Sequence, residues 1–380
     1  MSDAIRPFEL HVDQVQLDDL RRRLATTRWI ESETVTDWSQ GVPLDYLKEL
    51  CEYWQLQYNW RDVESRLNSI GQFVTNIDGL DIHFLSVTSP RVDATPLLIT
   101  HGWPGSVIEF LDVIGPLSDP DLHGAPGARA FHVVCPSLPG YGFSDKPMDV
   151  GWDVSRIADA WATLMQRLGY EKFIAQGGDW GAGVSTSLAV RHPQRLLGLH
   201  LTMPIAVPTS LDPEILTAEE KVSLSAMGAF RLAESAYSAQ QSTRPQTLGY
   251  SLVDSPVGLA AWIVEKFHAW SDCEGSIESV MSRDAVLDNV TLYWLTASGG
   301  SSARLYWESF AKNDFTPTPV PTGCSLFPKE IYRPSRRWVE ARYSNLIYWN
   351  EPLRGGHFAA FEQPDIFVSE LRAFGRALSL

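Results

Sequence analysis

The sequence predicts an α/β fold in which helices cover both faces of a mostly parallel sheet. Short apolar segments typical of buried strands alternate with segments of helical periodicity between residues 96 and 192. Such alternation implies right-handed crossovers between parallel strands. The alternation stops at about residue 205, and strand-like segments resume at 323–327 and 346–349 before a final amphipathic helix at 363–378. We therefore expect a helical insertion within one α/β core.

Composition indicates a soluble globular protein. The chain has 380 residues, of which 44% are hydrophobic and 20% charged, and it carries a net charge of −15. The negative charge argues against nucleic acid or an anionic membrane as a partner. The first thirty residues carry charges throughout, and no apolar run is long enough to span a bilayer, so we expect no signal peptide and no membrane anchor.

The four cysteines indicate a reducing compartment. Their positions are scattered and lack the spacing of a metal site. Reduced core cysteines are typical of cytosolic proteins, so we expect a cytoplasmic location and no bound metal. The residues are Cys51, Cys135, Cys273 and Cys324.

We expect the chain to divide into three parts. Residues 1–90 hold two amphipathic helices and a hairpin, formed by 73–77 and 80–87, that opens the main sheet. Residues 91–204 and 311–380 form the α/β core. Residues 205–310 form a helical lid, with expected helices at 219–240, 257–269 and 287–296.

A turn follows the predicted strand at 96–100, and its backbone is expected to bind an oxyanion. Residues 101–106 read HGWPGS, and α/β-hydrolases take one oxyanion-hole donor from this loop. Pro104 has no N–H, so the amide of Trp103 is the better candidate, with the amide of Trp180 as the second. His101 more often has a structural role in such a turn than a catalytic one.

The glycine-rich stretch 177–181 (GGDWG) has the spacing of a nucleophile elbow, with Asp179 where serine is usual. An ordinary glycine-rich turn with Asp179 capping a helix is the alternative. An aspartate is already an anion at neutral pH, with an unperturbed pKa of about 3.9, and can attack saturated carbon without a base. The product is an ester that water must open. Epoxides and alkyl halides are the two expected substrate classes.

A nucleophile, an acid and a histidine follow one another in the order of α/β-hydrolases. His357 after two glycines is the expected general base for water, and Glu330 is expected to fix its tautomer. Glu351 and Asp365 are rival acids. The first lies six positions before His357, and the second begins the final helix, where it suits the N-terminal dipole.

Taken together, these motifs resemble the microsomal-type epoxide hydrolases of the α/β-hydrolase superfamily over nearly the whole chain. The resemblance implies an α/β-hydrolase fold with a helical lid and an N-terminal helical extension, and it supports Asp179, His357 and Glu330 in the roles given above. It also implies two lid tyrosines that donate hydrogen bonds to the epoxide oxygen, Tyr237 and Tyr306. The motifs lie at residues 101–106 (HGWPGS), 177–181 (GGDWG), 254–262 (DSPVGLAAW) and 354–362 (RGGHFAAFE).

The expected activity is hydrolysis of a small-molecule epoxide to a vicinal diol through an ester on Asp179, without a cofactor. A haloalkane dehalogenase and a non-catalytic ligand-binding protein of the same fold are the alternatives. The tyrosine pair argues against the first, and the complete set of reacting groups argues against the second. The resemblance also implies a homodimer. Lid tryptophans favour a bulky or aromatic epoxide; they are Trp262, Trp270, Trp294 and Trp307.

Overall fold

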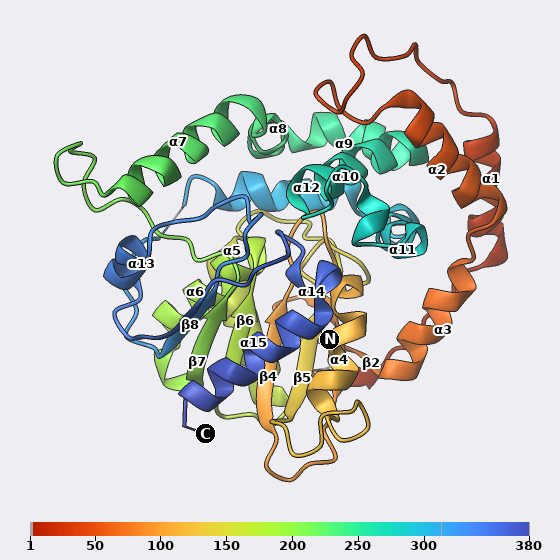
Figure 1. Ribbon diagram of the computed structural model, residues 1–380. Helices are drawn as coiled ribbons and strands as arrows, with labels where there is room; N and C mark the ends of the chain where they lie inside the picture. Colours follow the sequence, from red (N-terminus) through yellow and green to blue (C-terminus); the bar gives the residue numbers. More distant parts are fainter. Residues whose placement is uncertain (1–2, 313, 380) are drawn as a thin grey trace.

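A computed structural model describes residues 3–312 and 314–379, and within them one sheet of nine strands forms the centre of the molecule (Figure 1). Its strand order is β1-β2-β3-β5-β4-β6-β7-β8-β9. The strands are β1 (Arg6–Pro7), β2 (Gln72–Ile77), β3 (Leu80–Val87), β4 (Thr95–Thr100), β5 (Phe131–Pro136), β6 (Phe173–Gly177), β7 (Leu196–Leu201), β8 (Thr322–Ser325) and β9 (Leu346–Asn350).

The sheet is antiparallel at one end and parallel over the rest. Strands β1, β2, β3 and β5 pair antiparallel, and the pairs from β5 through β4, β6, β7 and β8 to β9 are parallel. Thr100 pairs with Gly177, and Gly177 pairs with Leu201, so three neighbouring strands end at the same edge. Open parallel sheets bind ligands at this carboxyl edge. The predicted fold class is confirmed.

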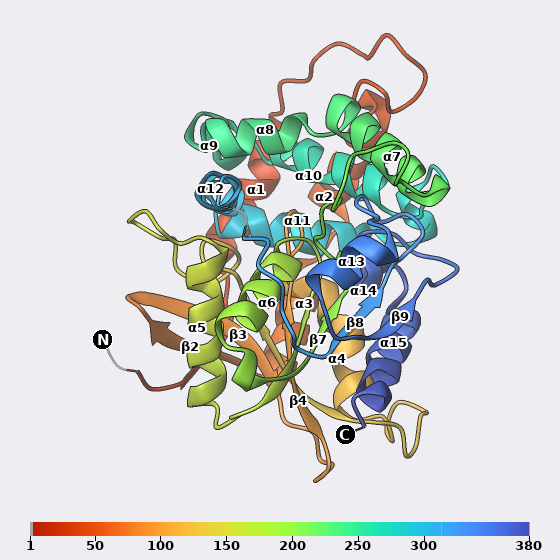
Figure 2. The same cartoon turned by 90° about the vertical axis from the view of Figure 1, so that its left-hand side faces the viewer.

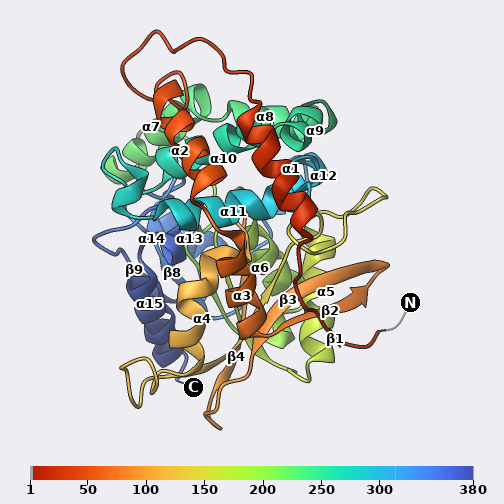
Figure 3. The ribbon, with the colours of Figure 1, turned by 90° about the vertical axis from the view of Figure 1, so that its right-hand side faces the viewer.

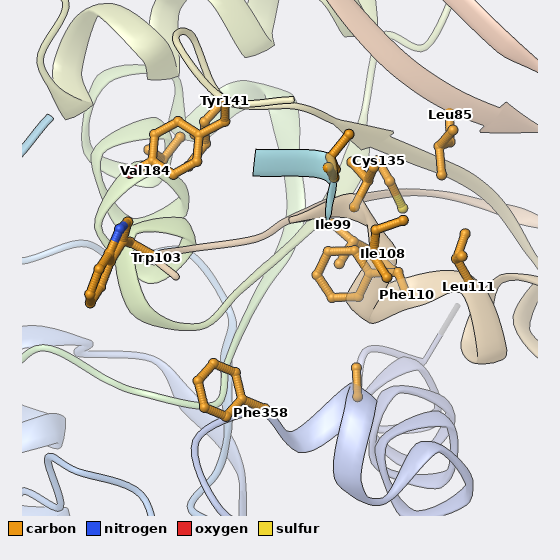
Figure 4. Close-up of a cluster of buried hydrophobic side chains, with 14 of the residues drawn as sticks. Leu85, Ile99, Trp103, Ile108, Phe110, Leu111, Cys135, Tyr141, Val184 and Phe358 are labelled. Atoms are coloured by element: carbon orange, nitrogen blue, oxygen red, sulfur yellow. The ribbon is translucent and has the colours of Figure 1, made fainter. Parts of the chain in front are cut away.

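Helices cover both faces of the sheet. Figure 2 shows α5 and α6 on one side of the strands and α4 and α15 on the other. The core between these layers is apolar, and Figure 4 shows Ile99 and Cys135 of the sheet beside Ile108 and Phe110. The covering elements are η1 (Val107–Phe110), α4 (Leu111–Ser118), α5 (Val154–Arg167), α6 (Asp179–Arg191), η2 (Pro193–Arg195), α13 (Arg336–Arg342), α14 (Ala359–Glu362) and α15 (Pro364–Ala377).

The segment between β7 and β8 forms a layer of helices above the carboxyl edge of the sheet, and we call it the lid (Figure 1). The helix expected over 219–240 is two helices, because α7 ends at Ala233 and α8 begins at Ala236. Helices α9 and α12 were not anticipated. The lid helices are α7 (Ala218–Ala233), α8 (Ala236–Thr243), α9 (Pro245–Asp254), α10 (Pro256–Trp270), η3 (Ile277–Ser279), α11 (Arg283–Leu295) and α12 (Ser298–Ser309).

The N-terminal helices support the lid from one side. Helices α1 (Gln14–Ala25) and α2 (Leu44–Leu56) contact α10, and α3 (Trp60–Ile70) contacts α11 (Figure 3). The indole N–H of Trp54 donates to Thr291 Oγ1 at 2.9 Å, and the Tyr58 hydroxyl donates to Asp288 Oδ1 at 2.7 Å. These contacts hold the lid against the N-terminal helices.

Among the described residues, none of the individual helices has both the length and the hydropathy needed to cross a membrane, and the bent pair α9 and α10 meets those criteria only when its two helices are taken together.

Candidate active site

The turn between β6 and α6 holds Asp179 in a strained backbone conformation. Asp179 has a φ of +48°, in the left-handed region that non-glycine residues rarely occupy. Its two flanking glycines allow this turn. A carbon added to Gly177 would lie 2.1 Å from the Gly181 carbonyl oxygen, and one added to Gly181 would lie 1.9 Å from the Thr100 carbonyl oxygen. The sequence therefore places the carboxylate at the sheet edge through residues without a Cβ.

The turn after β4 presents a backbone donor to Asp179. The Trp103 amide donates to Asp179 Oδ1 at 2.8 Å, and a carbon added to Gly102 would lie 2.2 Å from the same oxygen. Trp180 lies in the first turn of α6, where amides have no carbonyl partner within the helix. Of the two predicted oxyanion-hole residues, Trp103 thus contacts the Asp179 carboxylate, and Trp180 follows Asp179 in the chain.

His101 holds this turn in place. Its Nδ1 donates to the Gly102 carbonyl at 3.0 Å, and its Nε2 accepts from the Leu138 amide at 3.1 Å. Burial lowers the pKa of His101 to about 4, so the imidazole is neutral. Both ring nitrogens are occupied by backbone groups, which matches the structural role expected for this residue.

His357 lies between two carboxylates. Its Nδ1 donates to Glu330 Oε1 at 2.6 Å, and its Nε2 lies 3.5 Å from Asp179 Oδ2. Burial on its own lowers the pKa of His357, but the charge of Glu330 and the hydrogen bonds with Asp179 and Glu330 raise that pKa well above its usual value. The structure therefore places the three predicted triad residues in one contact chain.

The two rival acids lie elsewhere. Glu351 is half-exposed and accepts from Arg333 Nη2 at 3.0 Å. Asp365 is exposed in the first turn of α15. The carboxylate at the histidine is Glu330.

A second carboxylate, which the sequence analysis missed, holds the loop around His357. Glu362 accepts hydrogen bonds from the amides of Gly356, Phe358 and Asp272 at 2.7–2.9 Å. The His357 amide in turn donates to the Trp270 carbonyl at 2.9 Å. Burial raises the pKa of Glu362 to about 7. Its position at the end of the motif 354–362 was the available signal, and its contacts tie the base to the end of lid helix α10.

The two predicted tyrosines meet above Asp179. Tyr237 comes from α8 and Tyr306 from α12, both side chains are buried, and their ring centroids lie 5.9 Å apart. Tyr237 stacks on Trp103 at 5.1 Å, and Tyr306 meets the Trp180 ring edge-on at 4.7 Å. Burial raises the pKa of both phenols well above the usual value, so both are protonated at neutral pH.

No group of three or more histidine, cysteine, aspartate or glutamate side chains in residues 3–312 and 314–379 is arranged to hold a metal ion.

A mostly parallel sheet with a nucleophile-elbow turn after β6 and a lid of helices above its carboxyl edge defines the α/β-hydrolase class. Comparison with known proteins gives the same class. Residues 5–110 match the family model described as epoxide hydrolase N terminus, and residues 95–247 match the model of the alpha/beta hydrolase fold.

Individual relatives agree with the family models over almost the whole chain. A protein of Stigmatella aurantiaca, provisionally named epoxide hydrolase, is 55% identical and covers 99% of this chain and 86% of its own length. Epoxide hydrolase 1 of Oryctolagus cuniculus is 37% identical over 98% of this chain and 89% of its own. The crystal structure of juvenile hormone epoxide hydrolase from Bombyx mori superposes with a TM-score of 0.91 at 31% identity, covering 100% of this chain and 95% of that one.

The chain belongs to the epoxide hydrolase family of the α/β-hydrolase superfamily. It is an epoxide-hydrolysing enzyme.

Proposed function

We propose that the enzyme opens its epoxide in two chemical steps, with Asp179 as a covalent nucleophile. In the first step Asp179 Oδ2 attacks a ring carbon, because Oδ1 already accepts the Trp103 amide. The carbon–oxygen bond of the ring breaks, and the oxygen that leaves as an alkoxide takes a proton from Tyr237 or Tyr306. A protonated phenol on a buried side chain is suited to this role.

In the second step water opens the ester. His357 takes a proton from water, and the water oxygen forms a bond to the ester carbonyl carbon. The oxyanion that develops on Oδ1 is stabilised by the amides of Trp103 and Trp180. Collapse breaks the ester carbon–oxygen bond, and the leaving alkoxide takes the proton from the His357 imidazolium to complete the diol. The acid proton left on Asp179 returns to the tyrosinate, which restores the carboxylate and the phenol. Glu330 stabilises the imidazolium formed in between.

The contact chain from the Trp103 amide through Asp179 and His357 to Glu330 carries this proposal. The Trp103 amide is placed to stabilise negative charge on Asp179 Oδ1, and the Glu330 carboxylate is placed to stabilise positive charge on His357. The tyrosine pair above the nucleophile supports an oxygen leaving group over a halide, because a phenol can give a proton to an alkoxide and a halide needs none.

A single turnover in ¹⁸O-water tests the covalent step. With enzyme in excess over styrene oxide, the first diol should take its new oxygen from Asp179, and the label should enter the peptide that contains Asp179. Mass spectrometry of the diol and of the digested protein measures both. Label in the first-turnover diol would mean that water attacks the epoxide directly.

We further propose that the substrate is a bulky or aromatic epoxide, because the aromatic rings of Trp103, Trp180 and Trp270 surround the tyrosine pair. Comparing kcat/KM for styrene oxide and for propylene oxide tests this preference. A higher value for propylene oxide would contradict it.

We also propose a cytoplasmic location and a homodimer. The four cysteines are all free and buried, which supports a reducing compartment. Family resemblance alone supports the dimer. Activity in the soluble fraction of the source cells, and light scattering of the purified protein, test the two proposals.

A further inference from the structure

A small cavity of about 30 Å³ lies against the nucleophile on the side of the base. It has room for at least one water molecule, since a water needs about 10–15 Å³ of such space. Its walls include both Asp179 and His357, whereas the lid tyrosines are not part of its described lining. The cavity is therefore placed to serve the second chemical step, in which water opens the ester, and not the first.

A further carboxyl group, that of Glu109, lines this cavity. Glu109 belongs to η1, and its two neighbours, Ile108 and Phe110, are buried in the hydrophobic core (Figure 4). A carbon added to Gly105 would lie 1.3 Å from Glu109 Oε1, as one added to Gly102 would lie 2.2 Å from Asp179 Oδ1. Two glycines of one turn thus make room for two carboxyl groups that reach the same cavity.

The Glu109 carboxyl is enclosed by protein atoms although the residue keeps part of its surface exposed. Burial, together with the charge of Asp179, raises the pKa of Glu109 to about 8, while the charge of His357 and the Ser106 backbone oppose this rise. The group is therefore largely a neutral acid at pH 7, with one donor and one carbonyl acceptor.

A second polar atom at the cavity has no protein partner. Oε1 of Gln176 lies in a side chain that is 1% exposed, and it has no hydrogen-bond partner among the described residues. Buried acceptors of this kind are usually satisfied by an ordered water. The volume of the cavity, its polar lining and the unpaired Oε1 of Gln176 all indicate a water site.

We propose that this cavity holds the water that opens the ester and that Glu109 orients it. The water gives one proton to His357 Nε2 and donates its other hydrogen to the Glu109 carbonyl oxygen, which directs its lone pair at the carbonyl carbon of Asp179. The bond that forms is from the water oxygen to this carbon. The O–H bond whose proton His357 takes is broken, and the π pair of the carbonyl moves onto Oδ1 as the oxyanion. This inference rests on the covalent mechanism proposed above.

Rapid-quench kinetics with styrene oxide test the role of Glu109. In Glu109→Ala the rate of ester formation on Asp179 should stay within about threefold of the parent, and the rate of ester hydrolysis should fall by about 10- to 100-fold, as for a reacting group misplaced by about 1 Å. As a result kcat and KM should fall together while kcat/KM is preserved. A general structural defect would instead lower kcat/KM.

Two further variants separate orientation from loss of packing. Glu109→Gln keeps the shape and a neutral donor and acceptor, so it should recover most of the hydrolysis rate. Gly105→Ala puts a methyl group where the Glu109 carboxyl lies, so it should slow hydrolysis like Glu109→Ala, and the two changes together should not add. The matched surface control is Asp112→Asn, an exposed carboxylate of the adjoining helix α4 that should change neither step.

Two outcomes would overturn the inference about Glu109. Both are seen in the Glu109 variants, whereas failure of the covalent mechanism would be seen in the parent enzyme. Normal ester hydrolysis in a folded Glu109→Ala protein removes Glu109 from the step. If Glu109→Ala lowers the rates of ester formation and ester hydrolysis equally, and Glu109→Gln does not restore them, the role of Glu109 is structural. If the parent itself formed no ester on Asp179, the covalent mechanism would be wrong and this inference with it.

Discussion

Nε2 of His357 faces Oδ2 of Asp179 at 3.5 Å, and this contact couples the charge of the base to the state of the nucleophile. Although burial lowers the pKa of His357, Glu330 and Asp179 raise it well above its usual value, so the resting imidazole is favoured as a cation. In the mechanism proposed above, ester formation removes the negative charge of Asp179 and with it one cause of the raised pKa of His357. We therefore expect His357 to become neutral after alkylation, when the proposal needs it as a base for water.

The first prediction separates the two steps at His357. His357→Gln should consume about one equivalent of epoxide and then stall, because Asp179 needs no base to attack but water does. Mass spectrometry should find the adduct on the peptide that contains Asp179. Glu330→Gln should stall less completely, since it weakens or misorients the base without removing it.

Circular dichroism should show that these variants keep the parent fold. Normal turnover by a folded His357→Gln protein would exclude His357 from the mechanism. A protein that bound epoxide without forming adduct would place His357 in the first step.

The second prediction concerns the lid phenols. Tyr237→Phe and Tyr306→Phe should each slow ester formation by a factor on the order of 10 to 1000, as for loss of general-acid help, and the double variant should lose nearly all activity. Stopped-flow tryptophan fluorescence measures this step, because Trp103 and Trp180 contact the two rings. The hydrolysis rate of ester already formed should change little. Unchanged ester formation in the double variant would disprove the assignment.

The third prediction concerns stability against pH. The folded-state pKa of His357 is raised above the unfolded value of about 6.5, so its protonation stabilises the fold fully below pH 6.5, and this contribution is lost as pH rises through the folded-state pKa. The difference in unfolding free energy between the parent and His357→Gln should therefore shrink from pH 6.5 upward. Urea denaturation at several pH values measures it. A difference that grew with pH would contradict the raised pKa.

The fourth prediction compares two helical glycines. Gly181→Ala should destabilise the protein by about 1–3 kcal/mol, because its new carbon would meet the Thr100 carbonyl at 1.9 Å. Gly228→Ala in α7 is the control, since no heavy atom lies within 4 Å of the added carbon and alanine favours a helix by roughly 0.5–1 kcal/mol. Thermal unfolding should lower the Tm in the first and raise it in the second. Equal effects would mean that the elbow is not closely packed.

Local sequence patterns predict the parts of the protein that depend on backbone geometry. Gly177 and Gly181 around Asp179 predict the turn, because only residues without a Cβ allow the strand, the helix and the neighbouring turn to approach so closely. Strand periodicity likewise located β4 and β6. The break expected near residue 205 is the start of the segment that carries the lid, whereas the division of 219–240 into α7 and α8 was missed because nothing in the local periodicity marks it.

Tertiary packing sets which distant side chains meet. Glu330, Glu351 and Asp365 are all carboxylates close to His357 in sequence, and the path of the chain after β8 brings the first of them to its Nδ1 while the other two face solvent or another partner. The approach of Glu362 to the Asp272 amide depends on how α14 packs against the end of α10. Such contacts are set by the packing of whole elements, whose energy is spread over many residues far apart in the chain, and no short motif encodes it.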